Sequence, residues 1–153
     1  MKIVYVPLDS GIVITHAAPI VARQAASFPL LLESIPAGFP SPAEHFVDRA
    51  LDLNEYLIAH PAATFFIKVE GDSMIDAGIS SGDILIVDRA KQAAHDSIVV
   101  AHIDGEFTIK RLKLVNGTVF LVPENAKYRP IQITEEMSFE VWGVVTFVIH
   151  DVR

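Results

Sequence analysis

Two residues of this sequence could together break a covalent bond. They are Ser73, in a Gly-Asp-Ser-Met stretch at 71–74, and Lys110, in a Glu-Phe-Thr-Ile-Lys stretch at 106–110. A serine hydroxyl is a poor nucleophile at neutral pH and needs a base to take its proton. A neutral lysine can play the part that histidine plays in a Ser-His-Asp triad. Most Gly-Asp-Ser strings are only turns, so a catalytic role for this pair needs support from the neighbouring sequence.

Those surroundings include an apolar stretch before Ser73 and a small-residue pair, Ala37-Gly38, in a segment marked by prolines. Pro40 and Pro42 bias the residues before them to extended backbone. An extended segment can add to a protease cleft as a strand does. Gly71 lets backbone N–H groups approach a developing oxyanion closely.

Short segments of the chain resemble the self-cleaving Ser-Lys peptidase domain of LexA-type repressors, and within that family they are similar to the UmuD-like SOS mutagenesis proteins. The resemblance covers about residues 35–153. The segments are Gly-Asp-Ser-Met-Ile-Asp at 71–76, Ser-Gly-Asp-Ile-Leu-Ile-Val-Asp at 81–88, Asp-Gly-Glu-Phe-Thr-Ile-Lys at 104–110, Ala-Gly-Phe-Pro-Ser-Pro-Ala at 37–43 and Leu-Asp-Leu-Asn at 51–54.

The resemblance implies a role for each site residue. Ser73 is expected to be the nucleophile and Lys110 the general base. The main-chain amides of Asp72 and Ser73 are expected to hold the oxyanion, and the bond that is cut is expected to be Ala37–Gly38. No metal and no cofactor are expected.

The resemblance also implies partners. Cleavage is expected to be stimulated by a RecA filament on single-stranded DNA. The shortened form is expected to act as a homodimer with a UmuC-like Y-family polymerase in error-prone lesion bypass, in the cytoplasm.

Three other functions stay open at this point. The chain could be a regulatory binding subunit that keeps the peptidase fold without significant turnover. It could be a signal peptidase, which also uses a Ser-Lys pair, or a fragment of a repressor.

The composition of the chain argues against some of these functions. The chain has 153 residues, a net charge of −7 and no cysteine, so it is long enough for one packed domain and has no disulfide framework. No run approaches the ~18 apolar residues of a membrane span. A DNA-binding face should be basic, and the only basic cluster is Lys110, Arg111 and Lys113. Strong direct DNA binding is therefore not expected.

The order of the elements predicts a mostly β fold with curled antiparallel sheets, and the resemblance implies that this fold is like that of LexA and signal peptidase. Residues 1–37 are expected to form an N-terminal arm that self-cleavage removes, with short strands at 2–6 and 12–15. Residues 38–63 are expected to form a linker with short helices starting at Ser41 and Asp52. The peptidase-like β domain is expected at 64–153. Its expected strands are 65–70, 84–89, 97–103, 106–115, 119–122 and 139–149.

Within strand 106–115 the alternation of side chains puts Thr108, Lys110 and Leu112 on one face. A lysine that shares a face with leucine can lose solvent, which lowers its pKa. The opposite face also carries apolar residues, so alternation does not decide which face is buried. The remaining expectations are that Met74 is either a wall beside the nucleophile or a core residue, and that Gly143 marks a bulge in the last strand.

Overall fold

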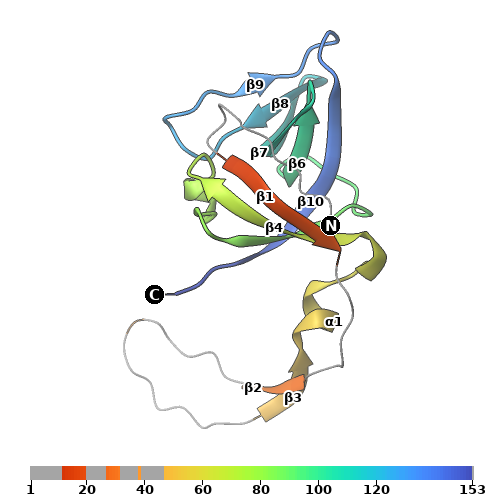
Figure 1. Cartoon of the computed structure of the whole chain (residues 1–153), viewed down its shortest axis with the longest axis vertical. Coiled ribbons are helices and arrows are strands. Elements are labelled where there is room, and N and C mark those ends of the chain that lie inside the picture. Colours follow the sequence, from red (N-terminus) through yellow and green to blue (C-terminus); the bar gives the residue numbers. More distant parts are fainter. Residues whose placement is uncertain (1–11, 20–26, 32–37, 39–46, 153) are drawn as a thin grey trace.

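The structure is a computed structural model that describes residues 12–19, 27–31, 38 and 47–152. Figure 1 shows these residues as a coiled antiparallel sheet with a smaller region below it. The strands are β1 Ile12–Pro19, β2 Ser27–Leu31, β3 Val47–Asp52, β4 Thr64–Gly71, β5 Ile84–Asp88, β6 Ile98–Ile103, β7 Glu106–Val115, β8 Thr118–Val122, β9 Ile131–Gln132 and β10 Phe139–Ile149. The mostly β prediction is confirmed.

Eight of the strands form one sheet in the order β1-β4-β5-β10-β6-β7-β8-β9. Every pairing in it is antiparallel, and β10 joins the two halves by pairing with β6 along its first part and with β5 along its second. Hairpin turns at Asp104-Gly105 and Asn116-Gly117 connect β6 to β7 and β7 to β8. Both turns have positive φ at both residues, which is why Asp-Gly and Asn-Gly occur there.

The long strand β10 changes register between Val141 and Gly143, so the predicted bulge is confirmed. A β-carbon at Gly143 would come within 2.6 Å of a methyl group of Val87 on β5. Glycine therefore lets two strands approach closely at this bend.

The region upstream of the sheet differs in part from expectation. The helix predicted at Asp52 is present as α1, Leu53–Leu57, and the Asp52 carboxylate accepts hydrogen bonds from the N–H groups of Asn54 and Glu55. The helix start at Ser41 and the strand at 2–6 lie outside the described residues. Strand β3 was not expected, and it forms because β2 gives its backbone an antiparallel partner.

The arm contributes two strands. β1, which extends beyond the predicted 12–15, pairs with β4 at the edge of the large sheet, and β2 pairs with β3 in a separate two-stranded sheet. The described part of the arm is therefore held by backbone pairing with β4 and β3.

The core consists of fully buried aliphatic side chains from β4, β5, β6 and β7, among them Val69, Leu85, Val100 and Ile109. Met74 belongs to this cluster and has no exposed surface, so it is a core residue. Packing against this cluster fixes the loop after β4, which contains Ser73. Within the described residues, no helix is long and apolar enough to cross a membrane.

Candidate active site

Ser73 and Lys110 meet in the interior of the large sheet. Lys110 Nζ lies 3.1 Å from Ser73 Oγ, although the two residues are 37 positions apart. The exposed fraction is 0% for Ser73 and 2% for Lys110. Ser73 follows the last residue of β4, and Lys110 lies in the middle of β7, so the packing of the sheet brings both to one point.

Within the described residues, Lys110 also contacts two oxygen atoms of its own strand, which help to fix its amine. Its Nζ donates to Thr108 Oγ1 over 2.8 Å and to the carbonyl oxygen of Ile109 over 3.0 Å. Thr108 is itself buried and lies on the same face of β7, two positions before the lysine. Sequence reasoning put Thr108 on this face but gave it no role. The spacing of two along a strand was the signal that could have found it.

Burial changes the chemistry of this lysine. Removal from water lowers the pKa of Lys110 from 10.5 to about 8, because desolvation penalises the charged form. At pH 7 a lysine with this pKa is neutral in about one molecule in ten, against fewer than about one in a thousand for an ordinary lysine. The amine is therefore available as a base near neutral pH.

Alternation of side chains does not decide which face of β7 is buried, and the structure shows that the middle of the strand is covered on both faces. Ile109 is fully buried on one face, and Thr108 and Lys110 are buried on the other. Leu114, on the face of Lys110, is half exposed because the strand leaves the core at its end.

The candidate oxyanion amides belong to Asp72 and Ser73, directly after Gly71, whose φ is 111°. The carbonyl oxygens of these two residues accept hydrogen bonds from the segment after β8. Asn125 Nδ2 donates to Asp72 O, and the Glu124 N–H donates to Ser73 O, both over 2.9 Å. No motif in the sequence predicts these two hydrogen bonds. The oxyanion role of the two amides stays a prediction.

The Asp72 side chain is also held by that segment. Tyr128 OH donates to Asp72 Oδ1 over 2.5 Å, and Lys127 Nζ lies 3.6 Å from Asp72 Oδ2. The bond from Tyr128, helped by the charge of Lys127, lowers the pKa of Asp72. The same bond raises the pKa of the Tyr128 hydroxyl.

The expected scissile bond is described on one side only. Gly38 is exposed, and a β-carbon added to it would meet no atom of the described residues within 4 Å. Ala37 lies outside the described residues. The residues described contain no group of three His, Asp or Glu side chains that could hold a metal ion.

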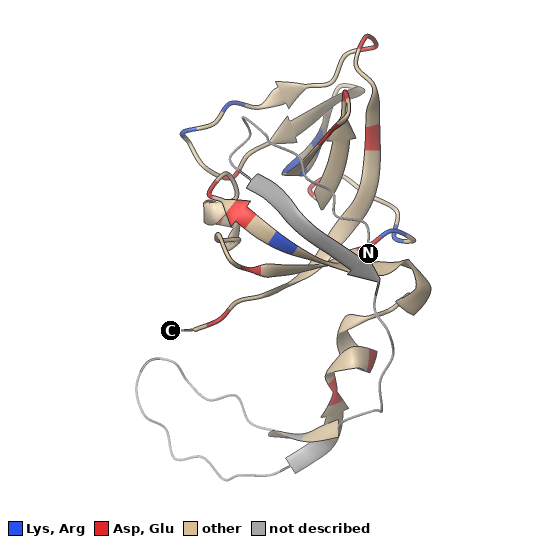
Figure 2. Ribbon diagram, in the orientation of Figure 1, with Lys and Arg blue, Asp and Glu red and all other residues tan. Residues whose placement is uncertain are grey.

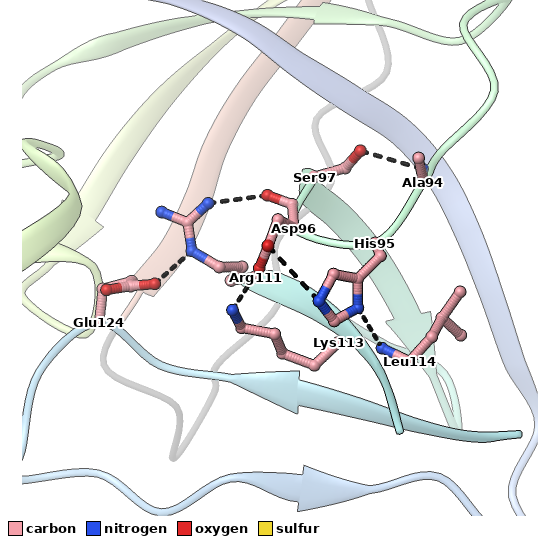
Figure 3. Close-up of polar contacts among 8 residues, drawn as sticks. All are labelled: Ala94, His95, Asp96, Ser97, Arg111, Lys113, Leu114 and Glu124. Atoms are coloured by element: carbon pink, nitrogen blue, oxygen red, sulfur yellow. Dashed lines mark hydrogen bonds and ion pairs between the residues drawn. The ribbon is translucent and has the colours of Figure 1, made fainter. Parts of the chain in front are cut away.

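Two basic side chains follow Lys110 on β7, Arg111 and Lys113, and both are paired with acidic or carbonyl groups (Figure 3). Arg111 forms an ion pair with Glu124 and donates to the carbonyl oxygen of Asp96, and Lys113 forms an ion pair with the carboxylate of Asp96. Figure 2 shows the remaining described Lys and Arg residues spread along the ribbon among acidic ones.

Comparison with known proteins agrees with this geometry. The family model described as Peptidase S24-like matches residues 29–146. Protein SamA of Salmonella typhimurium is 48% identical over 125 residues, which are 82% of this chain and 86% of SamA. Protein MucA of Escherichia coli is 47% identical, covering 82% of this chain and 86% of MucA. The LexA repressor of Stenotrophomonas maltophilia is 38% identical over 74% of this chain and 54% of the repressor.

The family match spans most of the chain, and both SamA and MucA align with most of their length. The chain therefore belongs to the Peptidase S24-like family, alongside the UmuD-like proteins SamA, ImpA and MucA.

Proposed function

We propose that this chain is a serine peptidase that cleaves its own Ala37–Gly38 bond, with Ser73 as nucleophile and Lys110 as general base. The observation that carries the proposal is the buried contact of 3.1 Å between Lys110 Nζ and Ser73 Oγ. The lowered pKa of the lysine, about 8, supports it further. Membership of a family of serine peptidases agrees with this chemistry.

A neutral amine has two N–H donors and one lone pair. Thr108 Oγ1 and the Ile109 carbonyl oxygen can take the two donors, and the lone pair can then take the proton of the Ser73 hydroxyl. This orientation is the one that general-base catalysis requires.

In the first step, Ser73 Oγ attacks the carbonyl carbon of Ala37 while its proton passes to Lys110. The negative charge moves to the carbonyl oxygen, where the amides of Asp72 and Ser73 stabilise it. The C–N bond then breaks, and the lysine returns the proton to the nitrogen of Gly38. An ester between Ser73 and Ala37 remains.

In the second step, neutral Lys110 takes a proton from a water molecule, and the oxygen of that water attacks the ester. Ser73 leaves and regains a proton from the lysine. The products are residues 1–37, the N-terminal arm, and residues 38–153, which contain the linker with its helices and the β domain.

The biological setting is proposed from the relatives. Cleavage is stimulated by a RecA filament on single-stranded DNA, and the 38–153 product acts as a homodimer with a UmuC-like Y-family polymerase in the SOS response, in the cytoplasm. The pairing of Arg111 and Lys113 with acidic residues supports a partner role over strong direct DNA binding.

The test is the intact mass of the protein after incubation with RecA, ATP and single-stranded DNA. The wild type should yield the 38–153 fragment. Ser73→Ala should remain full length, because it lacks only the nucleophilic oxygen, and its unfolding temperature should show that it is folded. A fragment from Ser73→Ala would disprove the mechanism. A folded wild type that is never cut would favour a binding subunit without turnover.

A further inference from the structure

The loop that contains Ser73 is held by a second loop, residues 123–130, which we call the clamp loop. Three hydrogen bonds, all of 2.9 Å, hold main-chain groups of the Ser73 loop: Glu124 N to Ser73 O, Asp76 N to Glu124 O and Asn125 Nδ2 to Asp72 O. Tyr128 and Lys127 contact the carboxylate of Asp72.

Asn125 is the side chain of the clamp loop that contacts the main chain next to the nucleophile. Its Oδ1 accepts a hydrogen bond from the N–H of Lys127 over 3.0 Å, and this leaves Nδ2 directed at the carbonyl oxygen of Asp72. Both ends of the amide are therefore used, which fixes its orientation.

The peptide group between Asp72 and Ser73 is rigid and planar, and in a trans peptide the C=O and the N–H point in opposite directions. The structure contains no cis peptide bond in its described part. A bond that holds the Asp72 carbonyl therefore also sets the direction of the Ser73 N–H. That N–H is one of the two proposed oxyanion donors, and such donors act only when they are aimed at the developing charge.

We infer that Asn125 is a positioning residue, which aims the Ser73 amide at the oxyanion by holding the carbonyl group of Asp72. The inference rests on the proposed function. Asn125 has no contact with Ser73 Oγ or Lys110 among those the structure gives, so it acts on the oxyanion and not on the base.

Other contacts of this region help to separate an effect on the direction of the Ser73 N–H from an effect on the stability of the loop. The Ile75 N–H also donates to the Asp72 carbonyl, over a longer 3.3 Å, so removal of Asn125 leaves a weaker and differently directed bond. Tyr128 holds the Asp72 carboxylate, which can rotate without turning the peptide plane. The ion pair between Arg111 and Glu124 anchors the clamp loop to β7 (Figure 3).

The experiment measures spontaneous cleavage of the full-length protein against pH, without an activator, in Asn125→Ala and Asn125→Asp. Asn125→Asp keeps the acceptor for the Lys127 N–H but cannot donate to Asp72 when ionised, so it removes the bond while retaining the turn. Tyr128→Phe loosens the clamp loop without touching the peptide. Asn54→Ala, an exposed position on α1, is the matched control. Unfolding temperatures are measured for all four variants.

Loss of a whole oxyanion donor costs about 100- to 1000-fold, so a misdirected one should lower the plateau rate by about 10- to 100-fold in both Asn125 variants. The apparent pKa of the rise should stay at the wild-type value in Asn125→Ala, and the rates of Tyr128→Phe and Asn54→Ala should stay within about threefold of the wild type.

The inference is overturned if a folded Asn125 variant keeps its plateau within about threefold of the wild type. It is also overturned if the apparent pKa of Asn125→Ala moves, or if Tyr128→Phe loses as much activity as Asn125→Ala. Should Asn125→Ala not fold, Asn125→Asp decides by its plateau. Failure of the proposed function would appear separately, as an uncut wild type or as cleavage in Ser73→Ala.

Discussion

The two parts of the molecule that must meet in the proposed self-cleavage differ sharply. The proposed catalytic part is buried and cross-connected: Ser73 and Lys110 have almost no exposed surface, Lys110 donates a hydrogen bond to Thr108, and the clamp loop donates one to the Ser73 carbonyl oxygen. The proposed substrate part is attached through backbone pairing of β1 and β2, and Gly38 is exposed, with space for a β-carbon among the described residues. The pair of catalytic residues is therefore already assembled, and we expect delivery of the bond to control the reaction.

Strand β1 of the arm lies beside both strands that position the candidate catalytic residues. β1 lies along β4, the strand that leads to Ser73, and close to β7, the strand that carries Lys110. Part of the arm thus already lies beside the strands that lead to Ser73 and carry Lys110, whereas Gly38 is exposed. Variants that affect only one part should separate catalysis from delivery.

The largest effect is expected from Lys110→Arg. A base must be neutral, and arginine cannot lose its proton in this range, so the variant should be inactive at every pH. Wild-type spontaneous cleavage should rise with pH through about 8 and then level off, because burial lowers the pKa of Lys110 to that value. The measurement is the initial rate of fragment appearance from about pH 6 to 11, bounded by the reference lysine pKa.

The fold must be checked at each pH by circular dichroism, so that unfolding is not mistaken for titration. Lys110→Ala should be inactive as well. A flat wild-type profile, or clear activity of the arginine variant, would exclude Lys110 as the base.

A smaller effect, on delivery, is expected from Gly38→Val. Since a β-carbon at Gly38 meets no atom within 4 Å in the part of the chain that the structure describes, the variant should unfold at the wild-type temperature. Its β-branched side chain should crowd the cleft during cleavage, and displacement of the reacting atoms by about 1 Å costs about 100-fold in rate. Gly38→Ala is the matched control and should be slowed less. A wild-type rate in Gly38→Val would show that Ala37–Gly38 is not the bond that is cut.

The smallest effect is expected from Thr108→Val, which keeps the shape of the side chain and removes its hydroxyl. Lys110 loses an acceptor that both orients the amine and stabilises its charged form. The plateau should fall by about tenfold because general-base catalysis depends on this alignment. The rise should move to lower pH, since loss of the acceptor lowers the pKa of Lys110 further. A rise at higher pH would contradict this role of Thr108.

Much of the fold could be predicted because its signals are local. Apart from the two-residue β9, the strands from β4 to β10 have runs of β-branched and aromatic residues between Gly-containing turns, and all six fall within one residue of the predicted ends. The start of α1 at Asp52 could also be predicted locally, because a helix cap depends on residues two and three positions away. By contrast, β2 and β3 were missed because each is a strand only through its partner.

The sequence by itself determined the residue types for Ser-Lys chemistry, the strand that carries Lys110 and the turn that leads to Ser73. Only the tertiary structure decided that the middle of β7 is buried on both faces and that Lys110 reaches Ser73 Oγ. It alone also brought Asn125 to the carbonyl group of Asp72, 53 positions earlier in the chain. The physical reason is that alternation defines two faces of a strand, whereas burial, and with it the pKa of a lysine, depends on which distant elements cover each face.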